Sequence, residues 1–462
     1  MSVNLEEPGP SRIKRKNSDP EQGHGESKCK TEETHQLMSS GNEEDTEEEK
    51  AAKLGEYLSS QYEVVLRLLN NLPAFDLRRA AQVSKSWQTA ANVIRDSRFQ
   101  FHWLFWRANS GGWNIPPPLA LYSSLCEHVY SQPTLCIAFF TRSAIKTFEC
   151  SAEYLCPVTK QYKCCGKQHP VESYMSLALG PKCTLLSFTV SGVIGTSLDL
   201  KSTFEVEHIN RGKAQAMSAA LFPNSPGVKI VRFKMTKQEL FQKRSSTELA
   251  KDLGIPSNML IQALALFTGH RVRENELSML VAHLQARQEH RFAVAGGIGE
   301  KADGIEGLVF LGDDVAAVSL IIPETVTEKD TVVEHVTKIK NCNLPSERSM
   351  CLMFTCLGRG TMWYLGENNV ESSIINKMFP QSPVIGFFGR GEIGLNFLCN
   401  FPAHQDSKLF WQDFKSICNE SKKSLEAPPK EVKRGEFYQI DHAYSTCLLY
   451  LTFNVTSANL SL

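Results

Sequence analysis

The sequence has no long apolar run and no excess of charge. No apolar segment reaches about 18 residues, the minimum for a membrane-spanning helix, so we expect no membrane span. The 462 residues include 50 basic and 50 acidic side chains, which argues against nucleic-acid or membrane binding through bulk charge. The first residues lack the basic start and apolar core of a secretory signal, so we expect an intracellular protein.

Several motifs of known chemistry are also missing. There is no Gly-x-Ser-x-Gly elbow, no P-loop and no His-Glu-x-x-His sequence. Gly389, Gly391 and Gly394 form a GxGxxG pattern, but the segment after them reads as extended, whereas a dinucleotide site needs a helix there. We therefore expect no cofactor.

The cysteines do not follow a familiar metal-binding spacing. Cys156, Cys164, Cys165, His169 and Cys183 form a loose group among 14 cysteines. Structural zinc sites usually contain paired cysteines with two to four residues between them, whereas Cys156 and Cys164 are further apart and Cys164 and Cys165 are adjacent. We expect reduced thiols and no metal site.

The first 52 residues are polar and end in an acidic run, so we expect residues 1–52 to form a disordered tail. Arg12, Lys14, Arg15 and Lys16 form a basic cluster of the nuclear-import type. We expect a cytoplasmic and nuclear protein, and whether this cluster acts as an import signal stays open.

Residues 58–87 have the apolar pattern of two short amphipathic helices joined by a turn. Residues at helical spacing in the first are Val65, Leu68, Leu69 and Leu72, and Pro73 ends it. Asp76 is expected to cap the second, whose shared face holds Leu77, Ala80, Ala81, Ser84 and Trp87. Two helices of about 15 residues cannot bury both faces against each other, so they contact either a larger core of this chain or a partner.

The remaining chain alternates between helical and extended patterns. An aromatic connector at 101–118 is expected to pack the helices onto the next domain. Helices are predicted at 119–130, 236–253, 274–289, 329–340 and 369–379, and strands at 134–141, 184–190, 228–233, 292–295, 307–311, 315–322, 350–356, 384–388 and 447–453. We expect a hairpin over 307–322, an exposed loop at 415–436 and an α+β, mixed α/β, fold.

Two glycine-rich turns each follow an apolar strand and carry a charged residue, Arg359 in one and Glu392 in the other. If the strands are neighbours, these side chains meet at one sheet end and form either a structural ion pair or a site for a polar ligand. Cys356 precedes the first turn, and we interpret it as a buried strand-end thiol rather than a nucleophile because no partner histidine is identifiable.

Two parts of the sequence resemble known families. Leu72-Pro73, Asp76-Leu77 and Val83-Ser84-Lys85-x-Trp87 stand at F-box spacing, although Ser60-Gln61-Tyr62 replaces the Leu-Pro that usually opens an F-box. The stretches at 354–360 and 386–394 are similar to the C-terminal half of the FIST domain. An all-helical F-box at 55–100 would then precede a large mixed-sheet FIST-type domain at 119–462, with its C-terminal half at about 260–455.

The resemblance implies a non-catalytic adaptor: an F-box binds a Skp-family adaptor and, through it, a cullin, while the FIST region recruits client proteins for ubiquitination and degradation. The residues it assigns to the adaptor interface are Val65, Leu68, Leu69, Leu72, Pro73, Leu77, Val83 and Trp87. A ligand or client site is implied at Cys356, Arg359, Gly391 and Glu392. The alternative is a FIST signalling protein that senses a small polar ligand such as an amino acid. The client and the oligomeric state stay open.

Overall fold

The structure is a computed structural model. It describes residues 46–108, 117–145, 147–150, 155–207, 214–241, 245–269, 272–300, 304–404, 406–426, 432 and 438–454. The chain divides into two compact units, Met1–Lys53 and Leu54–Leu462. The basic cluster at 12–16 and most of the expected tail lie outside the described residues. Helix α1 (Glu47–Ser60) includes residues 47–52, so this end of the expected disordered tail is helical.

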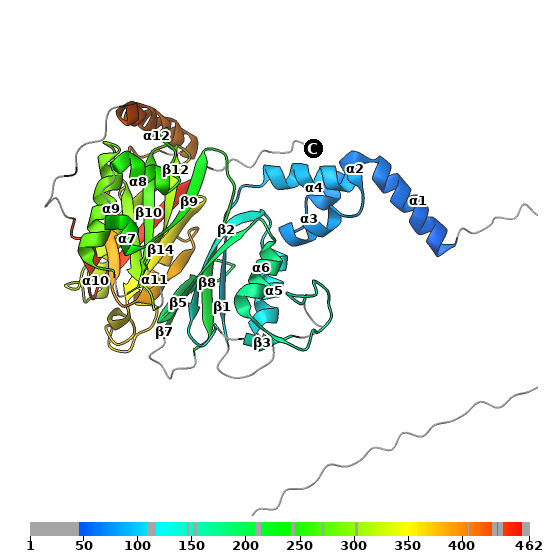
Figure 1. Ribbon diagram of the computed structural model, residues 1–462, viewed down its shortest axis with the longest axis horizontal. Coiled ribbons are helices and arrows are strands. Elements are labelled where there is room, and N and C mark those ends of the chain that lie inside the picture. The colour runs from blue at the N-terminus through cyan, green and yellow to red at the C-terminus, as the bar shows by residue number, and fades with distance from the viewer. Residues whose placement is uncertain are drawn as a thin grey trace, which may run out of the picture. The chain divides into compact units, whose positions relative to one another are not determined.

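Three further helices follow: α2 (Tyr62–Leu69), α3 (Ala74–Ala80) and α4 (Lys85–Ser97) (Figure 1). The expected second helix is thus two helices. Pro73, not Asp76, is the N-cap of α3. Ser84 lies outside the helical faces, because its side chain accepts a 3.2 Å hydrogen bond from the Trp87 backbone N–H and caps α4. Serine competes for backbone groups in this way and therefore favours helix starts over helix interiors.

The rest of the second unit is built on three large sheets. Sheet I has the order β1 (His102–Arg107), β8 (Ala216–Pro223), β2 (Pro133–Thr141), β5 (Thr184–Val190). Sheet II has the order β17 (Asp441–His442), β16 (Glu392–Leu395), β11 (Ala293–Ile298), β10 (Ile261–Thr268), β12 (Ile305–Gly312), β9 (Val228–Met235). Sheet III has the order β13 (Val315–Ile322), β18 (Thr446–Phe453), β14 (Ser349–Cys356), β15 (Val384–Gly389), β6 (Gly192–Thr196), β7 (Thr203–Glu207). A short pair consists of β3 (Thr147–Glu149) and β4 (Gln168–Pro170).

Each large sheet contains a parallel pair, namely β2–β5, β10–β11 and β14–β15. Parallel neighbours need a long crossover, and here the crossovers contain α6 (Val171–Leu179), α9 (Glu274–Ala286) and α11 (Val370–Met378). These helices cover the outer faces of the sheets together with α5 (Pro117–His128) on sheet I, α8 (Ser246–Asp252) on sheet II and α10 (Lys329–Lys340) on sheet III.

The inner faces of the three sheets enclose one apolar core. Phe139 of sheet I lies 4.9 Å from Phe387 of sheet III and 5.8 Å from Phe267 of sheet II, measured between ring centroids. Because one aromatic cluster connects all three sheets, residues from β1 to β18 fold as a single α+β domain behind a small helical module. The expected fold class is confirmed.

Several local expectations are wrong. The segments 307–311 and 315–322 do not form a hairpin, because β12 pairs with β9 and β10 in sheet II whereas β13 pairs with β18 in sheet III. The aromatic connector contains a strand, β1, that pairs with β8. The expected loop at 415–436 overlaps α12 (Ser407–Lys422) and a 3-10 turn, η2 (Lys423–Glu426).

The expected helix over 236–253 is divided. Helix α7 (Lys237–Phe241) ends before α8, where Ser245 and Glu248 form a reciprocal capping box that starts a new helix. Among the described residues, none of the helices has the length and apolarity needed to cross a membrane.

Candidate partner-binding surface

The module of helices α2, α3 and α4 has its own small core, separate from that of the sheets. Three of the residues expected at an adaptor interface, Val65, Leu69 and Leu77, are buried in this core. Leu72 and Trp87 are half-buried against it, and Pro73 is half-buried at the start of α3. These six residues therefore shape the module, and substitutions among them report on folding as well as on binding.

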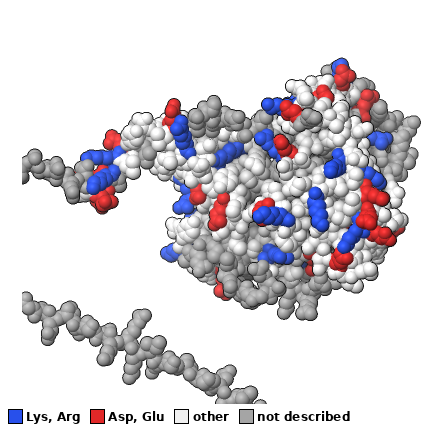
Figure 2. All heavy atoms as spheres, turned by 180° about the vertical axis from the view of Figure 1, so that it is seen from behind, with Lys and Arg blue, Asp and Glu red and all other residues white. Residues whose placement is uncertain are grey.

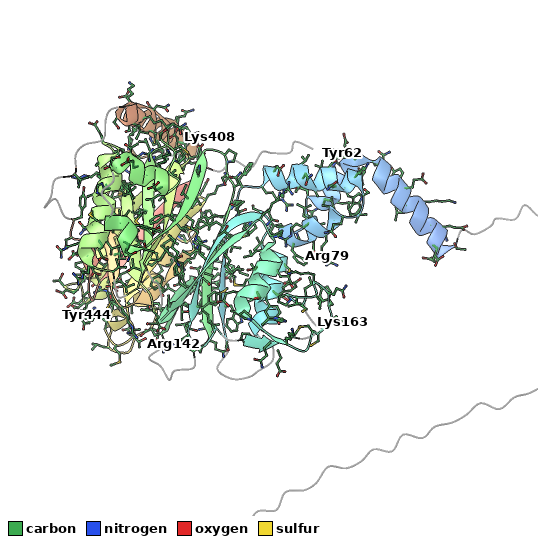
Figure 3. All side chains as sticks on the ribbon, in the orientation of Figure 1. Tyr62, Arg79, Arg142, Lys163, Lys408 and Tyr444 are labelled. Carbon is green, nitrogen blue, oxygen red and sulfur yellow. The ribbon has the colours of Figure 1, made fainter. Side chains whose placement is uncertain are left out.

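Two of the expected interface residues are instead exposed. Leu68 on α2 is 49% exposed, and Val83 in the turn before α4 is 65% exposed. Sequence reasoning missed Tyr62 and Val64, which are exposed on α2 as well, although the spacing of Val64 and Leu68 places them on one helix face. Figure 3 labels Tyr62 at the start of α2. Exposed apolar side chains gathered within residues 62–83 are typical of a surface that a partner covers.

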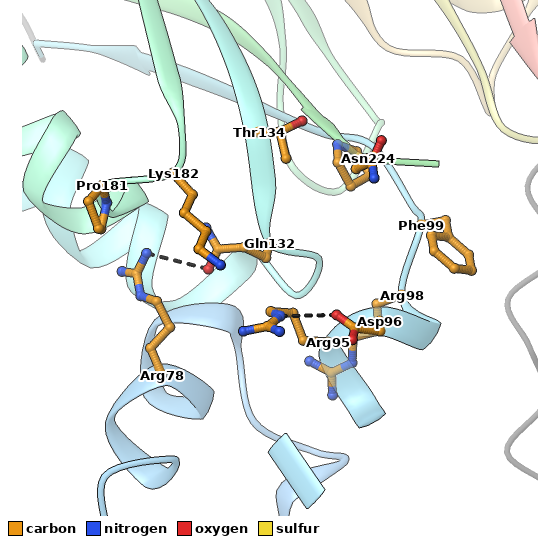
Figure 4. A pocket seen from close by; sticks show the side chains of 11 residues that line it. Arg78, Arg95, Asp96, Arg98, Phe99, Gln132, Thr134, Pro181, Lys182 and Asn224 are labelled. Atoms are coloured by element: carbon orange, nitrogen blue, oxygen red, sulfur yellow. Dashed lines mark hydrogen bonds and ion pairs between the residues drawn. The ribbon is translucent and has the colours of Figure 1, made fainter. Parts of the chain in front are cut away.

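Arg78 attaches the module to sheet I's helices (Figure 4). Its guanidinium donates to the carbonyl oxygens of Ala178 and Leu179 at the end of α6, and lies 3.5 Å from Oε1 of Gln132. Gly180 ends α6 with a φ of 89°, and a Cβ at this position would collide with Arg78. Glycine thus both ends the helix in the left-handed region and leaves room for the arginine.

Arg98 ties the other side of the junction. It donates to the carbonyl oxygens of Asn70 at 2.6 Å, Leu72 at 2.7 Å and Tyr130 at 3.0 Å, which satisfies orphan carbonyls at the end of α2. The backbone N–H of Ala74 also donates a 2.8 Å hydrogen bond to the carbonyl oxygen of Val129. These contacts hold the module in one orientation against sheet I.

An aromatic contact supports the same junction. Phe75, on the side of α3 away from the module's core, packs edge-on against Tyr122 of α5 with centroids 5.6 Å apart. One short helix therefore contributes to two cores, which couples the orientation of the module to that of the large domain.

A hollow of about 400 Å³ lies at this junction, lined by the basic residues Arg78, Arg95, Arg98 and Lys182 (Figure 4). Most of that charge is already used, because Arg78 and Arg98 bind carbonyl oxygens and Nε of Arg95 lies 3.2 Å from Oδ1 of Asp96. The hollow is better explained as part of the junction than as an anion site.

His102 lies buried at the start of β1, where its Nε2 accepts a 3.0 Å hydrogen bond from the backbone N–H of Ser131. Burial, together with the positive charge of Arg98, lowers the pKa of this imidazole to about 4. A neutral His102 is therefore part of the junction at neutral pH.

The second expected site does not bring Arg359 to Glu392. Arg359 is fully buried in the turn η1 (Leu357–Arg359), and its Nε lies 2.7 Å from Oε1 of Glu371 on α11. The guanidinium also donates to the carbonyl oxygens of Val326 at 2.8 Å and of Pro323 and Tyr444 at 3.2 Å. Because each of these bonds is internal, Arg359 is a structural residue and is not available to a ligand.

The other three residues do come together. Glu392 lies close enough to Cys356 for each group to affect the pKa of the other, and Gly391 directly precedes Glu392 in the chain. Oε2 of Glu392 accepts hydrogen bonds from the hydroxyl of Ser445 at 3.1 Å and from its backbone N–H at 3.3 Å, while Oε1 is buried without a hydrogen-bond partner among the described residues.

Burial raises the pKa of Glu392 to about 8, and burial together with this carboxyl group raises the pKa of Cys356. A nucleophilic cysteine needs a lowered pKa, so this environment disfavours covalent catalysis at Cys356.

Sequence reasoning missed two residues that define this region, Glu371 and Ser445. Glu371 carried a usable signal, because it lies four residues before Ile375 on the helix face that the pattern predicts to be buried. Ser445 precedes a strand in an irregular segment and gave no such signal. The structure also gathers part of the loose cysteine group, described below, and leaves Cys183 outside it.

Charged side chains elsewhere are mixed in sign. Figure 2 shows basic and acidic side chains interspersed over the face that it displays, in agreement with the equal totals of the sequence. The features of this face do not by themselves favour a highly charged partner.

The two regions match two known domain families. The F-box domain family matches residues 62–95, the helices α2 to α4, and the FIST C domain family matches residues 248–395. Both resemblances seen in the sequence are thereby confirmed, with an F-box ahead of a FIST C domain. We call α2 to α4 the F-box below.

The chain is also similar to proteins that are named for an F-box. F-box only protein 22 from Homo sapiens is 26% identical over 358 residues, which is 73% of this chain and 85% of that protein. The protein of the same name from Pongo abelii is 26% identical over 360 residues with the same coverage. A solved structure, cyanuic acid hydrolase from A. caulinodans, aligns over 77% of this chain and 100% of its own with 9% identity, but its TM-score of 0.29 is too low to support any argument.

Proposed function

We propose that the chain is a substrate-recognition subunit of an SCF-type cullin ubiquitin ligase. In this role the F-box binds a Skp-family adaptor and, through it, a cullin, and the FIST-type domain recruits a client protein for ubiquitination and degradation. The observation that carries the proposal is the F-box itself, a helical module with a complete core whose surface still exposes Leu68 and Val83.

The firm junction supports this role. A ligase subunit must present its client at a defined distance from the ubiquitin-loaded enzyme, so a flexible link between adaptor-binding and client-binding parts would reduce transfer. Here the link is rigid, because Arg78, Arg98 and Phe75 each join the F-box to the elements around sheet I. On this reading the chain needs no catalytic residue of its own, and it acts in the cytoplasm and nucleus.

The adaptor interface is proposed to be centred on Leu68 and Val83. The buried residues Val65, Leu69 and Leu77 support this surface from below, and Leu72, Pro73 and Trp87 contribute their exposed edges. Fully burying an exposed apolar side chain of this size contributes about 1.5–3 kcal/mol, and about half of that, roughly 1–2 kcal/mol each, is left to gain at Leu68 and Val83, which are 49% and 65% exposed.

The alternative, sensing of a small polar ligand, has one observation in its favour: the buried Oε1 of Glu392. A ligand with a donor group would satisfy this oxygen. The internal pairing of Arg359 removes the carboxylate-binding half of the expected site, so a zwitterionic amino acid fits less well than a neutral or cationic donor. Thermal unfolding of wild type and Glu392→Gln with added amino acids and amines tests this: a shift seen only in wild type supports the alternative.

The proposed function is tested by reconstitution. The full chain is mixed with a purified Skp-family adaptor and cullin, and co-elution and ubiquitin transfer to the chain or a captured client are measured. Leu68→Asp with Val83→Asp is the informative variant, since charges at exposed positions leave the F-box core intact. Leu72→Asp with Trp87→Asp would be ambiguous, because both residues pack on that core.

Matched charges elsewhere serve as the control. Val333→Asp on α10 and Leu409→Asp on α12 alter exposed apolar residues far along the chain from the F-box. The proposal predicts complex formation by wild type and by this control, and its loss in the F-box variant. A folded wild-type chain that never co-elutes with the adaptor would contradict the proposal.

A further inference from the structure

Three cysteines and one histidine lie together beside the short strand pair β3–β4. The side-chain ligand atoms of Cys150, Cys156, Cys165 and His169 all lie within 4.8 Å of one another. Nε2 of His169 is 3.0 Å from Sγ of Cys165 and 3.9 Å from Sγ of Cys156. Cys150, Cys156 and His169 are buried, and Cys165 is half-buried.

The local backbone aims these side chains at one point. Cys150 directly follows β3, and its N–H donates to Lys167 at 3.1 Å, so it sits beside His169 of the paired strand β4. Cys156 begins a tight turn, in which its own N–H donates to Gln161 at 3.0 Å. The N–H of Thr159 donates to Sγ of Cys156 at 3.4 Å, a contact that stabilises a thiolate.

The segment between Cys156 and His169 has no apolar core of its own. Every residue from 157 to 168 is exposed or partly exposed. A polar segment of this kind cannot offset its ordering entropy by burying apolar surface. Small structures without an apolar core are usually held together by disulfides or by a metal ion. None of the described cysteines is in a disulfide, so a bound metal is the remaining kind of cross-link for this segment.

We propose that Cys150, Cys156, Cys165 and His169 form a structural zinc site. Three thiolates and an imidazole are a donor set that Zn²⁺ prefers, and four protein ligands close the site to catalysis. Bonds of about 2.3 Å to sulfur and about 2.0 Å to nitrogen in a tetrahedron separate ligand atoms by about 3.5–3.8 Å, close to the spacing seen here. This revises our expectation, based on sequence spacing, that the chain has no metal site.

The charges balance on binding. The three thiols each release a proton when they bind Zn²⁺ as thiolates, and the imidazole binds in its neutral form. The occupied site therefore carries a net charge of −1. Lys160, Lys163 and Lys167 lie exposed on the same segment and offset that charge. The negative charge of the occupied site is thus paired with positive side chains of the same segment.

The vicinal pair divides its roles. Sγ of Cys164 points to the carbonyl oxygen of Cys150 at 2.8 Å and accepts the N–H of Gly166 at 3.3 Å, and it is outside the four-residue cluster. Cys165, one residue later, is inside it. This neighbour provides a matched control of the same chemistry at the adjacent position.

The site has a structural consequence for the F-box junction. His169 lies two residues before the first residue of α6, and α6 ends at the carbonyl oxygens that Arg78 binds. Zinc would therefore anchor the start of the helix whose end holds the F-box. The zinc proposal can be tested separately from adaptor binding, because metal content is measured on the chain without any partner.

The first test is metal content of the full chain, purified with a non-chelating reductant after growth with zinc. We expect about one zinc per chain in wild type and in Cys164→Ser, and less than a tenth of that in Cys156→Ser with Cys165→Ser. Replacement by Co²⁺ gives an optical test: wild type should show thiolate-to-cobalt charge transfer and tetrahedral d–d bands, which the double variant should lose.

A ligand-conserving variant separates coordination from folding. His169→Cys should keep stoichiometric zinc through a fourth thiolate, whereas His169→Ala should lose it. Circular dichroism confirms that each variant retains the fold of the sheets. Wild-type protein that is folded but takes up neither zinc nor cobalt would overturn the proposal, as would wild-type zinc content in the Cys156→Ser, Cys165→Ser variant.

Discussion

The F-box and the Arg359 region use their motif residues in opposite ways. In the F-box, part of the apolar pattern builds a core and the rest, including Leu68 and Val83, stays exposed. Around Arg359, the charged residue of the motif is fully buried and bonded to Glu371 and to backbone carbonyls. A motif residue therefore indicates a binding surface only where the fold leaves it unused.

This difference has an energetic basis. An exposed leucine contributes little to folding and gains stabilisation when a partner covers it. A buried guanidinium gains nothing from a ligand, since its hydrogen-bonding groups are already directed at the protein, and it strongly destabilises the fold once its partner is removed. The expected substitution effects should follow this division.

The largest expected effect on stability is at Arg359. Arg359→Met leaves the Glu371 carboxylate buried without its cation and should destabilise the fold by about 3–5 kcal/mol, lowering the thermal midpoint of this large domain by about 4–7 °C. Arg390→Met, an exposed arginine in the neighbouring glycine turn, should change it by less than about 2 °C. Calorimetry of both variants measures this. Equal midpoints for the two would mean that the buried pair does not stabilise the domain.

The next largest effect is at the junction. Arg78→Ala removes two charge-assisted bonds to Ala178 and Leu179, each worth about 1.5–3 kcal/mol, so backbone amides around α3 and the end of α6 should exchange hydrogen at least about 10-fold faster. Arg79→Ala is the control, because this exposed neighbour contacts residues of its own helix, Asp76 at 3.8 Å and the Phe75 ring at 5.9 Å from its centre, rather than the carbonyl oxygens of α6. Unchanged exchange in Arg78→Ala would show that the F-box is not held by this arginine.

The smallest effect within the range to be measured, about 2 kcal/mol or less between pH 6.5 and 8, is a pH dependence at Glu392. The pKa of Glu392 is about 8 in the folded chain and about 4.5 in the unfolded chain. Between these pH values the folded state therefore keeps a proton that the unfolded state has released. The contribution of Glu392 to the free energy of unfolding is therefore fully present below about pH 4.5. This contribution is lost as the pH rises through 8, by at most about 1.4 kcal/mol per pH unit.

Glu392→Gln should flatten this slope, and Glu367→Gln, at an exposed carboxylate, should keep it. Unfolding measured from pH 6.5 to 8 avoids His102, whose lowered pKa acts with the opposite sign at lower pH. An unchanged slope in Glu392→Gln would assign the pH dependence to another group.

The sequence predicted elements well where pattern and burial agree. The strands at 184–190 and 315–322 were placed with the bounds that the structure gives, and the helix at 329–340 likewise. Strand β10 was missed, because the run Ile261–Thr268 is apolar on both faces and shows no alternation. The wrong hairpin had a related cause: turn residues allow the chain to reverse but do not select the sheet that the next strand joins.

The sites were predicted less completely for physical reasons. Helical spacing places Val65 and Leu68 on the same side of α2, and only packing shows that Val65 is buried while Leu68 stays 49% exposed. The partner of Arg359 depends on the approach of α11, which local sequence does not encode. The cluster around Cys156 depends on the pairing of β3 with β4, and sequence spacing alone argued against it.

The central claim is that the exposed part of the F-box binds a Skp-family adaptor. The most direct test is the affinity of the full chain for a purified adaptor–cullin complex, compared with Leu68→Asp, Val83→Asp and with Val333→Asp, Leu409→Asp. We predict that the first variant weakens binding by at least about 30-fold, the effect of losing about 2 kcal/mol, while the second binds as wild type does. Equal affinity of a folded Leu68→Asp, Val83→Asp chain and wild type would contradict the account.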